Sequence, residues 1–260
     1  MYRAGWTANA RRLAFRVRDL ALFLAGEVIP DSEELSRLSE IRERSGLSYS
    51  VHVSAGPELT SRRWNERRRA QNQLKRMIRH TRVLDPRAYV VACPAHHADR
   101  SGPELVRWQD TTQSALERLL GTGVDPARLC LQCRAPYEII VPMLESLGVS
   151  IAMVLASESS DYAMAKSLLA VVPDRIRVIQ WHGVDPDERA HRSLRYVPSK
   201  HASWLLGTLI RSGYGGLLTL SVFHESEFDE SMDLVTRAVA QLSGRVTDPT
   251  DQAVRPRPIR

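Results

Sequence analysis

Two histidines that follow an apolar segment are the first residues in this chain whose types and spacing point to chemistry. The segment Val178–Trp181 runs into His182 and Gly183, and His191 comes shortly afterwards. In α/β barrels the active site lies where strands end and loops begin, so a histidine at such a place is a candidate metal ligand. His52, which lies within an earlier apolar segment, is a third candidate of the same kind.

Carboxylates and further histidines that could complete a metal site lie in the loops. Asp185 and Asp187 stand between the first two histidines, beside a proline that favours a turn. The pair His96–His97 follows one apolar segment, and His224 follows the last one. Each has a plainer alternative. Asp185 and Asp187 would be turn residues, His96–His97 would be a solvated loop pair, and His224 would begin a helix. Both interpretations stay open for all of them.

The three cysteines form another candidate cluster. Cys130 and Cys133 have the spacing of a metal-binding or disulfide pair, and Cys93 ends the preceding apolar segment. Side chains three residues apart on a strand point to opposite faces. Cys130 and Cys133 can therefore share a metal ion or form a disulfide only if the strand ends between them. We therefore interpret them as buried structural thiols. An odd number of cysteines also fits a reducing compartment, which predicts a cytoplasmic protein.

The composition is that of one folded domain. Its 260 residues and 43% hydrophobic content are sufficient for a single large core. No apolar run reaches the roughly 18 residues that a membrane span needs, so we expect no membrane contact. The net charge of +6 is concentrated in residues 62–79, where apolar residues recur at helical spacing. This pattern indicates a solvated outer helix face, and it does not favour a nucleic-acid partner.

Short apolar runs alternate with amphipathic segments of helix length, which is the pattern of a parallel sheet with crossover helices. Seven strands are predicted, at residues 20–24, 48–54, 88–93, 128–132, 150–155, 177–181 and 217–223. Eight helices are predicted, at residues 8–17, 32–45, 61–81, 102–120, 136–147, 161–171, 199–212 and 225–242. We therefore expect an α/β fold, a TIM-type (β/α) barrel, over residues 1–243. A disordered tail rich in proline and arginine is expected over residues 244–260.

An eight-stranded barrel needs one strand more than these segments supply. Three explanations stay open: Met1–Trp6 is a vestigial first strand, the barrel is open at one seam, or the true start of the chain lies upstream. An open seam would expose strand edges, which soluble proteins normally cover. We expect the N-terminal segment, or a second chain in a homo- or hetero-oligomer, to lie there.

The order of these segments resembles the xylose-isomerase-like barrels, which include sugar-phosphate isomerases and abasic-site endonucleases. Within that group the chain most resembles the cobamide-remodelling phosphodiesterases. The resemblance rests on Asp19–Leu24, Tyr49–Val53, Arg67–Arg69, Leu84–Pro86, Leu129–Leu131, Trp181–Val184, His191–Leu194, Tyr214–Leu220 and Val222–Phe223. It implies a barrel that binds a divalent metal, zinc or manganese, and hydrolyses a phosphodiester in the nucleotide loop of a corrinoid.

Most of the metal ligands that the resemblance implies are replaced in this chain. His52, His182 and His191 match ligand positions. The remaining expected positions carry Ala92, Gln132, Val154, Ser157, Gln180, Ala190 and Ser221. Glutamine and serine are weak metal ligands, while alanine and valine have no atom that binds a metal. Three neutral histidines could still hold one zinc ion, but not a pair of metals.

We therefore expect a barrel in which metal-dependent hydrolysis is lost or much reduced, and which binds a corrinoid or another phosphorylated ligand with one metal or none. The expected ligand-binding residues are Gln132, Arg134, Gln180 and Ser221. The Arg134 guanidinium could bind a phosphate bidentately, or form a surface salt bridge instead.

Two other functions stay open. One is an active single-metal hydrolase or sugar-phosphate isomerase with a rebuilt site. The other is a non-catalytic scaffold subunit of an active homologue.

Overall fold

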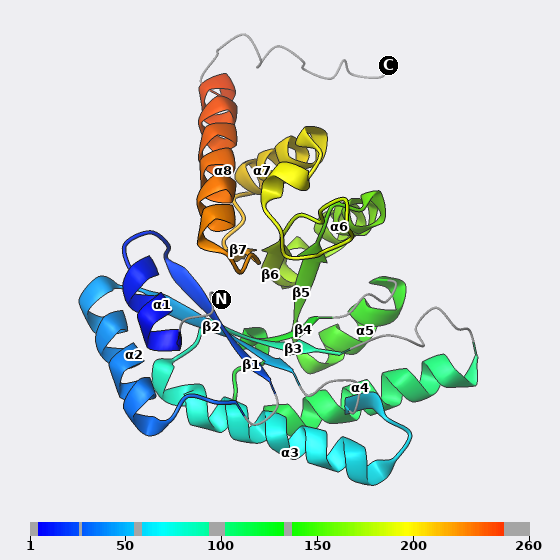
Figure 1. The fold of residues 1–260 in the computed structure, drawn as a ribbon. Helices are drawn as coiled ribbons and strands as arrows, with labels where there is room; N and C mark the ends of the chain where they lie inside the picture. The colour runs from blue at the N-terminus through cyan, green and yellow to red at the C-terminus, as the bar shows by residue number, and fades with distance from the viewer. Residues whose placement is uncertain (1–4, 26–27, 55–58, 94–101, 133–136, 247–260) are drawn as a thin grey trace, which may run out of the picture.

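The computed structural model describes residues 5–25, 28–54, 59–93, 102–132 and 137–246 of the chain. Its strands form one parallel sheet in the order β1 to β7. Their bounds are β1 (Asp19–Ala25), β2 (Ser48–Ser54), β3 (Ala88–Ala92), β4 (Leu129–Gln132), β5 (Ser150–Leu155), β6 (Ile176–Trp181) and β7 (Leu217–Leu220). A helix precedes β1 and another follows each strand, so the strands curve into a barrel with helices outside (Figure 1).

The α-helices in the described residues alternate with these strands. Their bounds are α1 (Trp6–Leu13), α2 (Ser32–Ser45), α3 (Trp64–Thr81), α4 (Pro103–Leu120), α5 (Tyr137–Leu147), α6 (Ser159–Val171), α7 (Ser199–Ser212) and α8 (Glu225–Val246). Short 3-10 helices lie at η2 (Arg82–Leu84), η3 (Pro126–Arg128), η4 (Pro173–Arg175) and η5 (Leu194–Tyr196). Within the described residues, no helix combines the length and apolar content of a membrane span.

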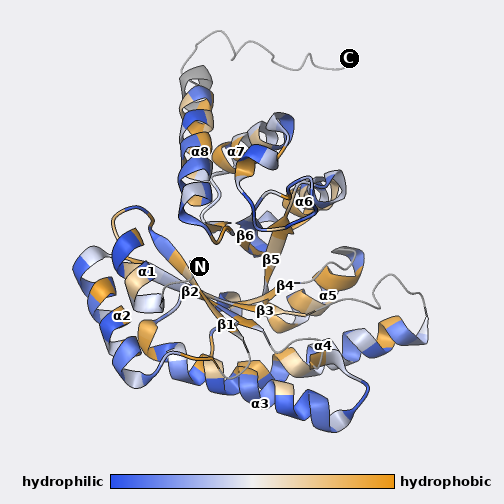
Figure 2. Ribbon diagram, viewed as in Figure 1, coloured by the Kyte–Doolittle hydropathy of each residue, from blue (hydrophilic) through white to orange (hydrophobic). Residues whose placement is uncertain are grey.

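Strands β2 to β6 are largely covered on both faces, which explains why they read as nearly continuous apolar runs. Outward-facing side chains such as Leu22, Val51 and Ile179 join the helices in one large core. A smaller cluster fills part of the barrel interior, and it consists of Ala88, Val90, Cys130, Ala152, Val178 and Leu217. Figure 2 shows that the strands are mostly hydrophobic, whereas the helices mix hydrophobic and hydrophilic residues.

Local signals in the sequence set the helix ends. The Asp31 side chain accepts a hydrogen bond from the Glu34 backbone N–H at 2.7 Å and so caps α2. Gly46 ends the same helix with a φ of 73°, a conformation that glycine adopts without strain. Gly213 ends α7 in the same way, with a φ of 64°. These positions explain why the predicted bounds of α2 and α7 agree with the structure.

The predicted elements are confirmed. Most ends agree within two residues, and four differ by more, among them the start of α3, which is Trp64 rather than residue 61. The last strand stops at Leu220 rather than at residue 223, because its partner β6 ends at Trp181, the residue that pairs with Leu220. The first helix is shorter than predicted and gives way to a turn after Leu13. The last helix continues to Val246, so the first residues of the segment expected to be disordered are helical. The rest of that segment lies outside the described residues.

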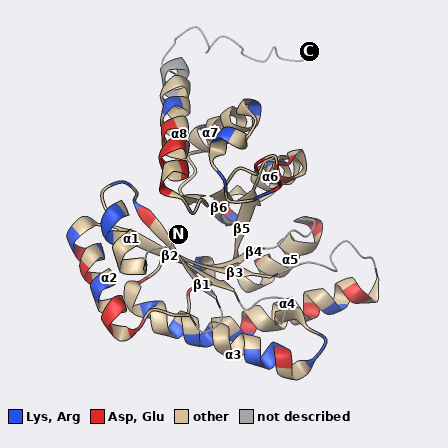
Figure 3. Ribbon diagram, viewed as in Figure 1, with Lys and Arg blue, Asp and Glu red and all other residues tan. Residues whose placement is uncertain are grey.

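Most basic residues of segment 62–79 lie on α3, where Figure 3 shows several blue stretches along the ribbon, and Arg68, Arg69, Arg76 and Arg79 are exposed. The inner face of the same helix buries Leu74, Met77 and Ile78 against the sheet. Arg68 stacks over the exposed Trp64 ring, with 5.0 Å between the guanidinium carbon and the ring centroid. The expected solvated helix face is therefore confirmed.

The barrel is open at one seam. Among the described strands, β1 pairs only with β2, and β7 pairs only with β6. Helices α1 and α8 flank this seam on the outside, where Arg12 forms an ion pair with Glu225 and Arg16 forms one with Asp229. The prediction of seven strands is confirmed, and the N-terminal helix lies beside the seam as expected. Most of Met1–Trp6, the segment that could form a vestigial first strand, lies outside the described residues, and Trp6 begins α1.

Candidate binding site at the barrel centre

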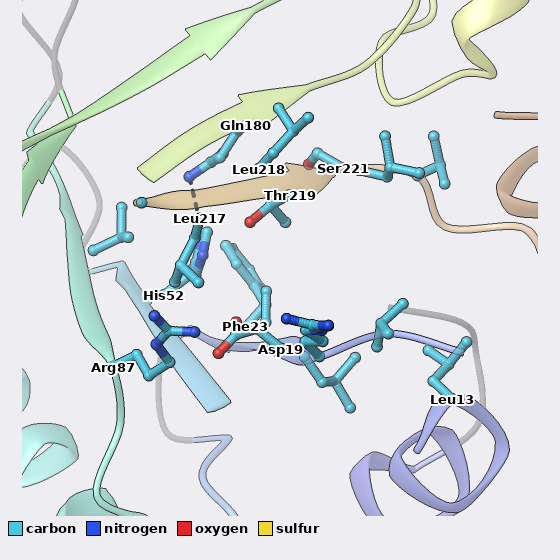
Figure 4. A pocket seen from close by; sticks show the side chains of 18 of the residues that line it. Leu13, Asp19, Phe23, His52, Arg87, Gln180, Leu217, Leu218, Thr219 and Ser221 are labelled. Carbon is cyan, nitrogen blue, oxygen red and sulfur yellow. Dashed lines mark hydrogen bonds between the residues drawn. The ribbon is translucent and has the colours of Figure 1, made fainter. Parts of the chain in front are cut away.

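A cavity of about 810 Å³ runs along the seam and reaches the centre of the barrel. Figure 4 shows Asp19 and Arg87 on one side of it, and Gln180, Thr219 and Ser221 across from them. Small-molecule sites in proteins have volumes of about 300–1,000 Å³, so the cavity is large enough for a ligand. Barrel interiors are normally filled by side chains in layers, so a cavity of this size is a specific feature of this barrel.

Three of the predicted site residues meet at the barrel centre. His52, Gln132 and Gln180 come from the alternate strands β2, β4 and β6, which in a barrel supply one layer of inward-pointing side chains. The amide nitrogen of Gln180 lies 3.1 Å from His52 Nδ1 and 3.0 Å from Gln132 Oε1 (Figure 4). An amide NH₂ group carries two hydrogens and donates one to each acceptor. The Gln180 amide therefore joins two atoms of the kind that would otherwise bind a cation.

This arrangement fixes the state of His52. Because Nδ1 accepts a hydrogen bond, the proton of the neutral ring lies on Nε2. Burial lowers the pKa of His52 to about 4, so the ring is neutral at pH 7. The Nε2 atom is itself buried and has no hydrogen-bond partner among the described residues. Buried donors in proteins are rarely left without a partner, so this N–H is an unsatisfied donor beside the cavity.

The other two predicted histidines form a separate pair beyond the carboxyl end of β6. The rings of His182 and His191 have their centroids 4.4 Å apart. His191 Nδ1 lies 3.0 Å from the carbonyl oxygen of Ser221 and 3.1 Å from its hydroxyl oxygen. Because a carbonyl only accepts, Nδ1 donates and Nε2 is the acceptor of the ring. Burial lowers the pKa of His191 as well, which favours its neutral form.

The loop after β6 folds back on itself and thereby positions His191. Gly183 and Arg192 exchange backbone hydrogen bonds of 2.8 and 3.1 Å. A Cβ atom on Gly183 would lie 2.1 Å from the carbonyl oxygen of Ser193, so only glycine fits at this position. Glu188 and His191 adopt positive φ values of 59° and 62°, which side-chain-bearing residues rarely adopt. The loop is therefore held in one conformation by specific contacts.

Asp185 holds this loop to α8 and is not available as a metal ligand. Its carboxylate lies 2.9 Å from Arg189 Nε and 3.1 Å from Arg192 Nε. Arg192 in turn lies 2.9 Å from Glu227 on α8. The neighbouring Asp187 has 73% of its side chain exposed and pairs with Arg189. The turn interpretation of Asp185 is therefore supported, and the metal-ligand alternative would require breaking these ion pairs.

Other predicted residues have structural roles. The Ser157 hydroxyl accepts a hydrogen bond from the Val184 backbone N–H at 2.9 Å and donates to the Tyr196 carbonyl at 3.2 Å. His224 is exposed and immediately precedes α8, which supports the helix-start alternative. Arg134, the pair His96–His97 and Cys133 lie outside the described residues.

The cysteines that the structure describes are structural, as predicted. Cys93 and Cys130 are both buried free thiols. Burial raises the pKa of Cys93 to about 11 and that of Cys130 to about 12, so neither is a thiolate at pH 7. Neutral buried thiols are poor metal ligands and poor nucleophiles.

Several residues of the cavity, among them Asp19, Arg18 and Arg87, were missed by the sequence interpretation. Asp19, the first residue of β1, accepts hydrogen bonds from the Ser48 hydroxyl at 2.7 Å and the Ser50 hydroxyl at 2.8 Å. Burial raises the pKa of this carboxyl group. The signal was present, because alternation along β1 places Asp19 on the same inward face as Ala21 and Phe23. An acidic residue on the inner face of an otherwise apolar strand is a candidate site residue.

The residues at the barrel centre do not fit a divalent metal. His52 Nδ1 and Gln132 Oε1, the acceptors that meet there, both receive hydrogen bonds from Gln180. Within the part of the chain that the structure describes, no group of three or more histidine, cysteine, aspartate or glutamate residues is placed to hold an ion. Zinc sites are built from such ligands, and glutamine amides are weak substitutes.

No protein-family model and no curated protein matches the chain. Solved structures do match. Endonuclease IV from Thermus thermophilus has 14% identity and a TM-score of 0.66, covering 93% of this chain and 97% of that one. D-psicose 3-epimerase from Clostridium cellulolyticum has 13% identity and a TM-score of 0.63, covering 92% and 95%. The IOLI protein, crystallised with a zinc atom, has 11% identity and a TM-score of 0.63, covering 94% and 93%.

These likenesses establish the fold. The chain has a TIM-barrel fold like that of endonuclease IV and of D-psicose 3-epimerase. The predicted TIM-type barrel is therefore confirmed, whereas the resemblance to the xylose-isomerase-like group and, within it, to the cobamide-remodelling phosphodiesterases stays a prediction. At identities this low the matches carry the fold alone, so the function has to be argued from the residues of the site.

Proposed function

We propose that this barrel binds a small polar ligand at its centre and has lost the metal-dependent hydrolysis of the phosphodiesterases it resembles. The observation that carries the proposal is the Gln180 amide nitrogen, which donates to both His52 Nδ1 and Gln132 Oε1. An ion at this position would need both of these acceptors. Its binding would therefore cost two buried hydrogen bonds and gain no anionic ligand in return.

The cavity supports retained binding. It offers the Nε2–H of His52 as a buried donor and the Asp19 carboxyl group as an acceptor. Arg18 and Arg87 also line it, and guanidinium groups bind phosphate oxygens well. We propose a corrinoid or another phosphorylated molecule as the ligand class, in line with the sequence resemblance. A cavity of about 810 Å³ would take the phosphorylated part of such a molecule.

The test measures binding and hydrolysis on the same protein. Equilibrium dialysis would compare a complete cobamide with cobinamide, which lacks the lower-ligand nucleotide, and chromatography would detect released nucleotide with and without Zn²⁺ or Mn²⁺. We expect the cobamide to bind, Arg87→Gln to weaken it, and no metal-stimulated release. Arg175→Gln, which removes the same charge at η4, is the matched control. Nucleotide release that requires metal and is lost in His52→Ala would overturn the proposal in favour of a single-metal hydrolase.

The second candidate function is a scaffold subunit that binds another protein. The open seam between β1 and β7 favours it, because two strand edges there are unpaired among the described residues. Gel filtration and crosslinking of the chain with proteins of its native host would show a stable complex if this candidate is correct. A chain that stays monomeric and unliganded in that mixture would count against it.

A further inference from the structure

The cavity has charged side chains at one end and aromatic side chains at the other. Asp19 begins β1 and Arg87 immediately precedes β3, so both lie at the amino ends of the strands. Phe23 lies four residues further along β1 on the same inward face, which places it about 13 Å from Asp19 at the rise of a parallel strand. Phe223 follows the carboxyl end of β7 and lines the same cavity. One phosphate or one ring therefore cannot occupy both ends.

The aromatic end presents two exposed phenylalanine rings. Phe23 is 53% exposed and Phe223 is 40% exposed, although both line the cavity. Figure 4 shows the Phe23 side chain directed into the cavity. Among the described residues, the other large apolar side chains with high exposure, such as Phe15, lie outside this cavity. The two phenylalanines therefore offer accessible ring surface to a ligand in the cavity.

Phe223 is the last ring of an aromatic stack that begins inside the protein. The buried His182 ring has its centroid 4.4 Å from that of His191, and His191 has its centroid 4.6 Å from that of Phe223. The His191 ring is held by its hydrogen bond of 3.0 Å to the Ser221 carbonyl. Tilted and offset aromatic pairs attract one another, so the stack positions Phe223 at the cavity wall. A ring of a ligand that packs on Phe223 would continue this stack.

The side chains near the aromatic end are small and partly polar. Ala92 ends β3 and has only a methyl group, so it leaves room in the cavity. Thr219 on β7 and Ser221 just after it add hydroxyl groups (Figure 4). A hydroxyl both donates and accepts hydrogen bonds. This end of the cavity therefore suits a heterocycle with ring nitrogens better than a plain hydrocarbon ring.

We infer that the ligand of this cavity carries a heterocyclic base, as a nucleotide does, and that the base stacks against Phe23 and Phe223. The inference rests on the proposed function, which supplies the phosphate contact at Arg87. A nucleotide has its base and its phosphate at opposite ends, and the cavity has its phenylalanines and its arginine in the same order. The nucleotide is either free or part of the nucleotide loop of a corrinoid, since the two share this ring and phosphate chemistry.

The first test compares ligands that differ in the ring. Adenosine 5′-monophosphate and ribose 5-phosphate share the sugar and the phosphate, and α-ribazole phosphate carries the benzimidazole base of a cobamide. Calorimetric titration of the full chain measures the affinity for each. We expect both nucleotides to bind roughly tenfold more tightly than ribose 5-phosphate, because stacking on aromatic side chains is available to every base. Tighter binding of α-ribazole phosphate identifies the corrinoid as the source, and tighter binding of adenosine 5′-monophosphate identifies a free nucleotide.

The second test removes the rings from the protein. A variant with both Phe23→Leu and Phe223→Leu keeps apolar side chains but has no aromatic face. We expect it to lose the preference for adenosine 5′-monophosphate over ribose 5-phosphate, while its affinity for ribose 5-phosphate stays that of the parent. The unchanged affinity for ribose 5-phosphate shows that the cavity is intact. Phe15→Leu is the matched control, because Phe15 is exposed outside the cavity, and it is expected to keep the preference.

A third variant tests whether the aromatic stack positions Phe223. His191→Asn keeps an N–H donor and suits the positive φ of 62° at this residue, but it removes the ring behind Phe223. We expect about threefold weaker binding of adenosine 5′-monophosphate and unchanged binding of ribose 5-phosphate. His80→Asn is the matched control, because His80 bonds the Pro30 carbonyl from α3, away from the cavity. An equal loss of affinity for both ligands in His191→Asn would contradict this positioning role.

Three results would overturn the inference. They are equal affinity for the nucleotides and ribose 5-phosphate, a nucleotide preference that persists in the double leucine variant, and no nucleotide binding up to about 1 mM, where the free energy of binding is only weakly favourable. Failure of the proposed function has a different signature. Metal-stimulated release of nucleotide from a cobamide would overturn the proposed function, while a preference for nucleotides over ribose 5-phosphate would still support base stacking.

Discussion

Replacing Gln180 by methionine should destabilise the protein more than any conservative change at the surface. Methionine has nearly the volume of glutamine but has no amide group, so the change leaves packing intact and removes two hydrogen bonds. His52 Nδ1 and Gln132 Oε1 would lose the donor that they share. Each buried acceptor that is left unsatisfied costs about 1–3 kcal/mol, so the expected loss of unfolding free energy is about 2–6 kcal/mol. Gln180 is only 6% exposed but lines the cavity, so water there offsets part of this cost and the expected loss lies in the lower half of that range.

Urea unfolding followed by circular dichroism measures this loss, as a lower midpoint at an unchanged slope. Gln113→Met is the matched control, because Gln113 bonds Glu117 at 3.1 Å on the surface of α4. We expect the control to stay within about 0.5 kcal/mol of the parent. If Gln180→Met were as stable as the control, the amide would not hold the barrel centre together, and the reasoning would be wrong.

Three further predictions follow from the site. Acid should destabilise the fold through His52: its folded pKa is about 4 and its unfolded pKa about 6.5. The unfolded chain therefore binds the proton first, and stability falls as the pH drops through that window, by roughly 2 kcal/mol between pH 7 and pH 5. Gly183→Ala places a Cβ 2.1 Å from the Ser193 carbonyl and should cost about 1–3 kcal/mol in urea unfolding. Asp185→Asn removes one of the two carboxylates paired with Arg192, while Glu227 remains, and also removes the buried partner of Arg189, so it should cost about 1–3 kcal/mol.

Each of these predictions has its own control. The acid effect should shrink in His52→Phe and persist in His80→Phe, and an unchanged pH profile in His52→Phe would contradict it. Gly215→Ala should be neutral, because a Cβ there meets nothing within 4 Å. Asp187→Asn should change stability little, since 73% of that side chain is exposed. Equal costs for the two aspartate variants would mean that the ion pairs of Asp185 do not hold the loop.

The order and ends of the elements were predictable because their signals are local. Asp31 and Gly46 mark the two ends of α2 through a side-chain cap and a left-handed backbone, and both effects depend on neighbouring residues only. The number of strands was also predictable, because each strand is a short apolar run. The end of β7 was not, because it depends on where β6 ends.

The candidate site was predictable as a set of positions but not as a network. The family resemblance identified His52, Gln132 and Gln180 as site positions, and the missing carboxylates were visible in the sequence. The hydrogen bond between Gln180 and His52, 128 residues apart, depends on barrel closure, so no local pattern contains it. For the same reason, the sequence alone indicated only that Gln180 replaces a metal ligand. The structure shows that its amide nitrogen donates hydrogen bonds to both His52 and Gln132.

The central claim is that the barrel centre is a neutral hydrogen-bonded network and not a cation site. Calorimetric titration of the full chain with Zn²⁺ and Mn²⁺ near neutral pH, combined with metal analysis of protein purified without chelators, tests it most directly. We predict no stoichiometric ion and no heat of binding that differs between the parent and His52→Ala. One tightly bound ion per chain, absent from His52→Ala and retained in His80→Ala, would contradict the claim.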